Sequence, residues 1–114
     1  MIKRLEIGKR MSQAVVHGST VYLAGQVAED TKADVAGQTR QVLATIDRLL
    51  AAAGSDKSKI LAATVYLADI GTFAAMNAAW DAWVAPGQTP ARATVEAALA
   101  APEYKVEIVV IAAL

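Results

Sequence analysis

Two charged residues stand in segments that are otherwise apolar, and they are the strongest candidates for chemistry in this sequence. Arg92 lies in the segment 91–95, and Glu107 lies in the segment 105–110. A guanidinium is costly to bury without an anion, and its fork of N–H groups matches a carboxylate. A carboxyl group in apolar surroundings has a raised pKa, which suits proton donation near neutral pH. The pair therefore predicts a site that binds an organic acid and transfers a proton.

Each of the two residues also has a purely structural interpretation. Arg92 could reach solvent or form an interface ion pair with Glu96 or Glu107, and Glu107 could be an edge-strand charge that faces water or a partner for Arg92. A direct hairpin of the last two strands would put Arg92 and Glu107 on one face, roughly 13 Å apart at about 3.3 Å per residue. Contact then requires either that the two strands are not neighbours or that a second subunit completes the site. The residues alone do not choose between these alternatives.

Other kinds of chemistry have little support. His17 is the only histidine and falls at a predicted hairpin tip, and the chain has no cysteine, so we expect neither a catalytic triad nor a transition-metal site. Gly18, Gly25 and Gly37 are not spaced as a phosphate-binding fingerprint. We therefore expect neither a metal site nor a glycine-rich phosphate-binding loop.

The composition excludes several classes of protein. The 114 residues predict one domain over residues 1–114, and eleven basic against eleven acidic residues leave no charge surplus for nucleic acid. Hydrophobic residues make up 55% of the chain, yet the longest apolar run, 108–114, is too short to cross a bilayer. The N-terminus has no signal-peptide core. We expect a cytoplasmic protein that buries surplus apolar surface between copies of itself.

The strands that must position the candidate residues are marked by β-branched residues and by turn residues. They are expected over residues 2–7, 14–17, 20–24, 60–67, 91–99 and 104–112. The dipeptide Gly18-Ser19 predicts a tight type II′ turn between the second and third strands.

Two helices are predicted from apolar residues that recur at steps of three and four. The first runs from an N-cap at Asp34 to a stop at Gly54. Its apolar face comprises Val35, Thr39, Val42, Ile46, Leu49 and Ala53. The second begins after Asp69 or Thr72 and ends before Pro86-Gly87. It presents Phe73, Met76, Trp80 and Trp83 for packing, and Asn77 on the same helix could line a cleft.

The element order is therefore β-β-β-α-β-α-β-β, an α+β fold with two helices on one six-stranded mixed sheet. Both helices cover the same face, so the other face is left bare. Several subunits can bury their bare faces against one another, and a trimer around a central barrel of sheets would do so.

The C-terminal third of the chain resembles the RidA (YjgF) family. Residues 89–96, Thr-Pro-Ala-Arg-Ala-Thr-Val-Glu, resemble a family signature in which an arginine enters a strand and a glutamate follows fifteen residues later, as Glu107 follows Arg92. Residues 21–26 resemble the family's strand that ends in Ser-Gly-Gln, and residues 38–54 and 73–80 resemble its helices. The resemblance covers roughly residues 11–112.

This resemblance implies a homotrimer of chorismate-mutase-like subunits with clefts at the subunit interfaces. It also implies hydrolysis of reactive enamines and imines, such as 2-aminoacrylate, to 2-oxo acids and ammonia without a cofactor. Arg92 would hold the substrate carboxylate and Glu107 would transfer the proton, with Gly25, Thr94 and Asn77 in the substrate-binding cleft. The ligand is then a small 2-imino or 2-oxo carboxylic acid, with no nucleic acid and no membrane as partner.

Three positions depart from the family's deaminases. Met11, at the mouth of the expected cleft, replaces the usual tyrosine, Ala24 replaces a serine, and Thr94 replaces a frequent cysteine. Each lost polar contact removes about 1 kcal/mol of binding. An alternative is therefore a non-catalytic trimer that binds or senses a small carboxylic acid in the same cleft. A ribonuclease activity, attributed to some relatives, is disfavoured by the neutral charge and single histidine.

Overall fold

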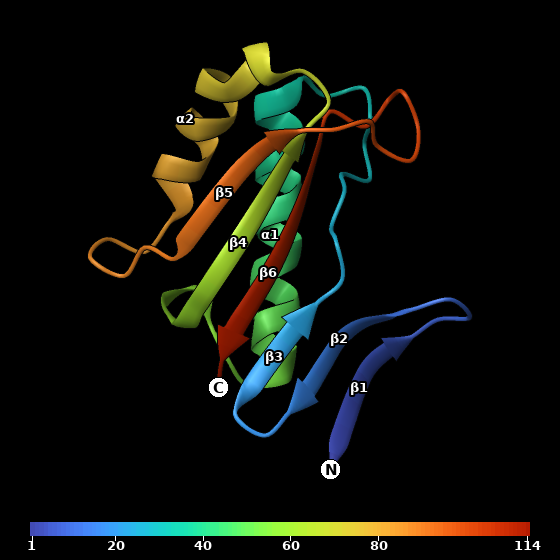
Figure 1. The fold of residues 1–114 in the computed structure, drawn as a ribbon, viewed down its shortest axis with the longest axis vertical. Coiled ribbons are helices and arrows are strands. Elements are labelled where there is room, and N and C mark those ends of the chain that lie inside the picture. Colours follow the sequence, from blue (N-terminus) through green and yellow to red (C-terminus); the bar gives the residue numbers. More distant parts are fainter.

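The computed structural model describes residues 1–114, and its elements follow the order β-β-β-α-β-α-β-β that the sequence predicts (Figure 1). The strands are β1 (Ile2–Ile7), β2 (Ser12–His17), β3 (Thr20–Leu23), β4 (Ile60–Leu67), β5 (Ala91–Glu96) and β6 (Val106–Ala113). The helices are α1 (Val35–Ala53), α2 (Phe73–Trp83) and the 3-10 turns η1 (Lys57–Lys59) and η2 (Ile70–Thr72). No helix is both long and apolar enough to span a bilayer.

The six strands form one mixed sheet in the order β1-β2-β3-β6-β4-β5. All neighbours are antiparallel except β4 and β5, which are parallel. The last strand, β6, is therefore central, and β4 separates it from the edge strand β5. The last two strands do not form a direct hairpin, because the α2 crossover places β5 parallel to β4 on the side away from β6.

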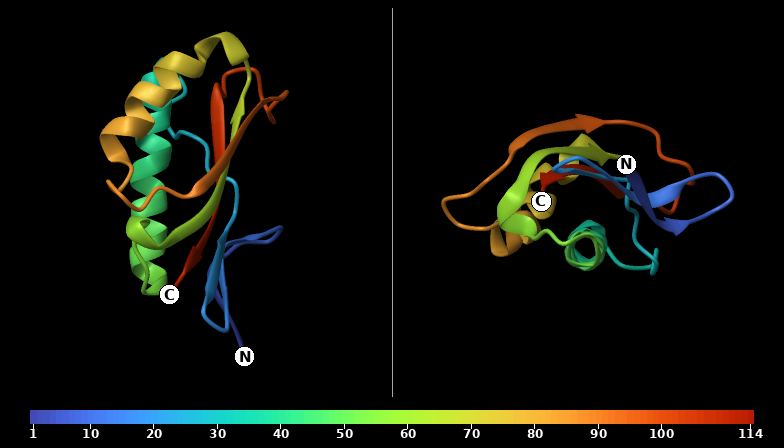
Figure 2. Two further views of the ribbon diagram at one scale, coloured as in Figure 1. Left: turned by 60° about the vertical axis from the view of Figure 1, so that its left-hand side comes forward. Right: turned by 90° about the horizontal axis from the view of Figure 1, so that it is seen from below.

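Both helices lie on one face of the sheet, as predicted (Figure 2). Side chains alternate along each strand, so β6 buries Val106, Ile108, Val110 and Ala112 beneath the helices. The other face carries no helix, and we call its part over β3, β6, β4 and β5 the open face. By strand register the open face includes Tyr22, Ala62, Thr64, Tyr66, Val95, Glu107, Val109 and Ile111. Glu107 is the one charged residue on this otherwise largely apolar surface.

The predicted ends of α1 are confirmed. The Asp34 carboxylate accepts a 2.8 Å hydrogen bond from the Gly37 N–H, and Gly54 takes a left-handed φ of 88° that ends the helix. After α1, the hydroxyl and N–H of Ser58 both donate to Asp56, which holds the pKa of that carboxyl below its usual range. These caps fix where the chain turns back into β4.

Helix α2 matches its predicted face only in part. Met76 and Trp80 are buried, but Phe73 is 42% exposed because it begins the helix above the edge strand, where no further element covers it. The Asp69 carboxylate caps the preceding turn η2, and Thr72 makes no side-chain cap for α2. The start of α2 therefore stays open to solvent beside β5.

Two strands are shorter than predicted, and one turn is confirmed. β5 ends at Glu96 instead of residue 99, and β6 begins at Val106 instead of residue 104. Gly18 has a φ of 61° while Ser19 has no positive φ, which is the combination of a type II′ turn. Residues 97–105 form a loop whose backbone groups bond to Gln38 of α1, to Leu67 and Ala68 at the end of β4, and to each other.

The side chain of Gln38 fastens this loop to the body of the protein. It is fully buried on α1, and its Nε2 lies 3.1 Å from the Glu103 carbonyl while its Oε1 accepts from the Lys105 N–H. The same Nε2 also reaches the carbonyls of Thr31 and Ala33, in the segment before α1. One amide therefore positions both the entry to α1 and the start of the strand that carries Glu107.

We expect Gln38→Leu to lower the free energy of unfolding by about 3 kcal/mol, because it leaves several buried backbone groups without partners. Urea unfolding at a fixed protomer concentration measures this loss. The matched control is Gln41→Leu on the same helix, whose side chain bonds only to the exposed backbone of Asp30. Equal midpoints for the two variants would contradict the role of Gln38.

Candidate functional site

Glu107 and Gly25, both predicted site residues, lie against each other on the open face. Gly25 follows β3, and its neighbour Gln26 pairs with Ile108 in an antiparallel bridge. A methyl group at Gly25 would collide with Oε2 of Glu107 and lie 3.0 Å from its Cδ. The glycine therefore leaves room for the Glu107 side chain, and its backbone is not left-handed. We call this pair the glutamate half-site.

The Glu107 carboxylate is free of partners within the protomer. It is half-buried on β6, opposite Tyr66 of β4, and forms neither an ion pair nor a hydrogen bond. Its neighbours on the open face are mostly apolar. A carboxyl group with free oxygens in such a setting can accept a proton from a bound molecule or donate one to it.

Arg92 projects from β5 onto the face that the helices cover. Its Cζ lies 4.9 Å from the centroid of the Trp80 ring and 6.0 Å from that of Phe73. Its Nη1 lies 3.9 Å from the sulfur of Met76. Because an aromatic face attracts a cation, α2 holds the guanidinium in place without neutralising its charge.

No carboxylate in the protomer pairs with Arg92. Glu96, two residues beyond Thr94 on the same strand, instead accepts a 2.9 Å hydrogen bond from the Ile70 N–H. The one ion pair in the protomer joins Arg48 to Glu6. Within the protomer the half-buried guanidinium therefore has no carboxylate partner, and an ion pair across a subunit interface stays a prediction.

Two further predicted site residues lie near Arg92: Thr94 is on the same face of β5, and Asn77 is on α2. Thr94 lies opposite the buried Val65, and its Oγ1 is buried without a hydrogen-bond partner. Asn77 follows Met76 on α2, is half-buried and makes no side-chain hydrogen bond. A buried hydroxyl without a partner is unusual in folded proteins. We call Arg92 and Thr94, with the α2 side chains around Arg92, the arginine half-site.

The two half-sites lie on opposite faces of the sheet. Arg92 pairs with Ala63 of β4, and Glu107 pairs with Tyr66, three residues further along the same strand. An odd step along a strand reverses the face, so the shared face expected for a direct hairpin is wrong. One protomer cannot bring Arg92 and Glu107 to the same small molecule.

Met11 lies in the turn between β1 and β2, at the edge of the sheet opposite to the edge strand β5 (Figure 1). It is 55% exposed, and its carbonyl accepts a hydrogen bond from the Gly8 N–H. Ala24, at the position of the family's serine, is bonded through its N–H to the Gln13 carbonyl and offers no hydroxyl beside Gly25. Their part in a cleft stays a prediction.

Sequence reasoning missed one contribution. It treated Phe73, Met76 and Trp80 as packing residues only, whereas all three contact the guanidinium of Arg92. Their helical spacing was visible, but the parallel pairing of β5 beneath α2 was not. Because β5 lies beneath α2, the apolar face of α2 both packs on the sheet and contacts the guanidinium of Arg92.

Comparison with known proteins gives consistent matches along the whole chain. The family model described as Endoribonuclease L-PSP matches residues 1–114. The RutC family protein YoaB of Escherichia coli is 50% identical over 113 residues, which is 99% of this chain and 98% of that protein. A solved member of the YjgF protein family from Neisseria meningitidis superposes with a TM-score of 0.97 at 50% identity, covering 99% of this chain and 94% of that one.

The contact between Gly25 and Glu107 predicts a reciprocal effect of substitution. Gly25→Ala should lower the free energy of unfolding by about 2 kcal/mol, because the new methyl group displaces the glutamate side chain. In the double variant with Glu107→Ala most of this loss should vanish, since the colliding atoms are gone. Urea unfolding of the two single variants and the double variant measures the coupling. Strictly additive losses would refute the contact.

Proposed function

Because the chain belongs to the RutC/YjgF family, whose model is described as Endoribonuclease L-PSP, we propose that it hydrolyses small enamines and imines that carry a carboxylate. The substrates are of the 2-aminoacrylate type, and the products are a 2-oxo acid and ammonia. One observation carries the proposal: Arg92 is a half-buried cation without an anion, and Glu107 is a half-buried anion without a cation. The carboxylate of a small imino acid would supply the anion that Arg92 lacks. A second protomer would bring the two half-sites together around that molecule.

The assembly in this proposal is a homotrimer in which the open face of one protomer is covered by its neighbours. Support comes from the composition of that face, where Tyr22 is 46% and Val95 is 42% exposed. An apolar sheet face of this kind favours association between copies. In the trimer the arginine half-site of one protomer meets the glutamate half-site of the next, and the substrate binds between them.

The chemistry then follows from the two charges. Arg92 binds the substrate carboxylate through parallel N–H groups, which fixes the reacting carbon near Glu107. Protonated Glu107 gives its proton to the methylene carbon of the enamine, which produces the iminium. Ionised Glu107 then takes a proton from the water that attacks the iminium carbon. Glu107, now protonated again, gives its proton to the amino group of the adduct and receives one from its hydroxyl, so that the adduct expels ammonia and leaves the 2-oxo acid.

Two groups orient the reactants in this scheme. The buried Thr94 hydroxyl, which has no partner in the protomer, hydrogen-bonds to the substrate or to the attacking water. Backbone groups beside Gly25 approach the reacting carbon closely because no side chain intervenes there. Asn77 and Met11 line the cleft further from the reacting atoms. Because enamines of this kind also hydrolyse in water, few catalytic groups are needed.

A non-catalytic binding role uses the same cleft and is the second candidate. It is favoured by Met11 and Ala24, which replace a phenol and a hydroxyl that the family's deaminases carry. Arg92 would still hold the carboxylate of a 2-oxo acid in this case. Turnover separates the two candidates, because only the first consumes the enamine.

RNA cleavage, which the description of the family model names, is not the function that this chain's residues favour. The formal net charge is zero, and the single histidine, His17, is exposed at the end of β2. A protein that contacts many RNA phosphates shows binding that weakens steeply with salt. We therefore place the small carboxylic acid first.

We expect Arg92→Gln to lower kcat/KM for 2-aminoacrylate by roughly 100-fold, because the bidentate charge-assisted contact is lost. Glu107→Gln should lower kcat by about as much, with little change in KM, since it removes the proton donor. Ammonia release from 2-aminoacrylate generated in the assay by a lyase gives both values. Arg48→Gln, on the outer surface of α1, is the matched control and should retain full activity.

If the unmodified protein does not accelerate ammonia release, the hydrolase proposal fails. Saturable binding of 2-oxobutanoate that disappears in Arg92→Gln would then establish the binding role. If Arg92→Gln still binds 2-oxobutanoate with the affinity of the unmodified protein, the binding role fails as well.

The opposite faces of the two half-sites also predict complementation. Arg92→Gln and Glu107→Gln are each inactive alone, but trimers that contain both variants have some interfaces with an intact Arg92 facing an intact Glu107. Co-expression in equal amounts with random mixing should restore roughly a quarter of the activity. The control is a mixture of the two separately purified variants without subunit exchange, which gives the activity expected without mixed trimers. No recovery in verified mixed trimers would mean that each site forms within one chain.

A further inference from the structure

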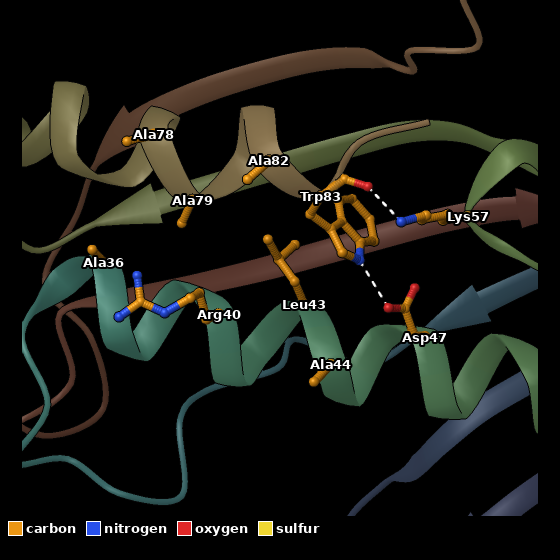
Figure 3. Close-up of a pocket in the computed structure, with 10 residues that line it drawn as sticks. All are labelled: Ala36, Arg40, Leu43, Ala44, Asp47, Lys57, Ala78, Ala79, Ala82 and Trp83. Atoms are coloured by element: carbon orange, nitrogen blue, oxygen red, sulfur yellow. Dashed lines mark hydrogen bonds between the residues drawn. The ribbon is translucent and has the colours of Figure 1, made fainter. Parts of the chain in front are cut away.

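A groove on the outer side of the two helices is separate from both half-sites. It has a volume of about 380 Å³ and lies between α1 and α2, with five alanines among its ten lining residues (Figure 3). Its exposed lining residues include Arg40, Ala44, Ala78 and Ala82, so it opens away from the sheet. The short alanine side chains leave the space between the helices unfilled, and Leu43 forms an apolar part of its wall.

The two ends of the groove differ in charge. Arg40 lies at one end, and no carboxylate or hydrogen-bond acceptor in the protomer engages its guanidinium (Figure 3). Arg48, two turns further along the same helix, is by contrast paired with Glu6 at 2.7 Å. Arg40 is therefore a cation that is available at the mouth of an apolar trough.

The other end is closed by hydrogen bonds between elements. The Trp83 indole Nε1 donates to Asp47 on α1 at 2.9 Å, and Lys57 Nζ donates to the Trp83 carbonyl at 2.6 Å (Figure 3). These bonds connect α2 with α1 and η1 across the groove. A continuous partner helix could not run through this end, but the tail of a small molecule could stop there.

We propose that this groove binds a small amphipathic monocarboxylate of the medium-chain fatty-acid type. Its carboxylate pairs with Arg40, and its apolar chain lies over the alanines and Leu43 toward the Trp83 indole. Arg40 and Asp47 are seven residues apart, so roughly 10 Å of groove separates them along the helix axis. The closed end carries both Asp47 and Lys57, and Trp83 already engages each of them, so this end offers no free cation to a second carboxylate and suits an apolar tail. The volume is in the range of small-molecule sites, which are mostly apolar with a few placed polar groups.

Octanoate is a suitable probe, and the full-length protein is the sample. The chain has two tryptophans, so its amide NMR spectrum contains two indole N–H signals, and that of Trp83 reports on the closed end of the groove. We expect octanoate to shift the Trp83 signal saturably, with the effect weakening as salt is added. Octan-1-ol and octylamine have the same chain and no negative charge, so they should bind at least about fivefold more weakly than octanoate.

Substitutions in the groove should follow the same pattern. Arg40→Gln should weaken octanoate binding about fivefold, and Ala82→Leu should prevent binding because it fills the groove. The matched controls lie outside the groove: Arg48→Gln is on α1 like Arg40, and Ala75→Leu is on α2 like Ala82. Both should bind octanoate as the unmodified protein does.

Three results would overturn the proposal. The first is a Trp83 signal that does not move with octanoate, and the second is equal binding of octanoate and octan-1-ol. The third is a Trp83 signal that shifts with protein concentration alone, which would mean that a second copy of the chain occupies the groove. None of these measurements depends on turnover of an enamine.

Discussion

The alternation of side chains along β4, β5 and β6 is the constraint on which the rest of this molecule depends. It directs Val65, Val106 and Ile108 toward the helices to form the core, and it directs Glu107 away from them. The same alternation sends Arg92 under α2. The pleat that buries the core therefore also divides the two charged residues between the two sides of the sheet, and any chemistry that uses both requires more than one protomer.

The protein keeps two unpaired charges at half-buried positions, and the structure shows how the cost is contained. Trp80 stacks on the guanidinium of Arg92, and this contact stabilises the cation by about 1 kcal/mol while its N–H groups remain free. On the other face, the absence of a side chain at Gly25 makes room for the Glu107 carboxylate. Both arrangements hold a charged group in position without supplying its counter-ion, as a binding site for an external ligand requires.

Much of the fold was predictable from the sequence because it depends on local signals. Asp34 and Gly54 mark the ends of α1, and Gly18 marks the hairpin turn, each through a preference of its own backbone or side chain. What local signals cannot give is the order of strands. The position of β4 between β5 and β6 depends on how α2 crosses the sheet, and the separation of Arg92 from Glu107 depends on that position. The candidate residues were therefore identifiable, but their arrangement was not.

The space above Gly25 has a consequence for how this chain can change over time. The side chain at position 107 occupies the volume that any Cβ at position 25 would need. A side chain at position 25 is accommodated only when the side chain at 107 moves aside or becomes smaller, so a substitution at 25 depends on the residue at 107. Among diverged copies of this chain, a residue larger than glycine at position 25 should therefore accompany a small residue at 107, and such a pair would identify descendants that have given up the acid.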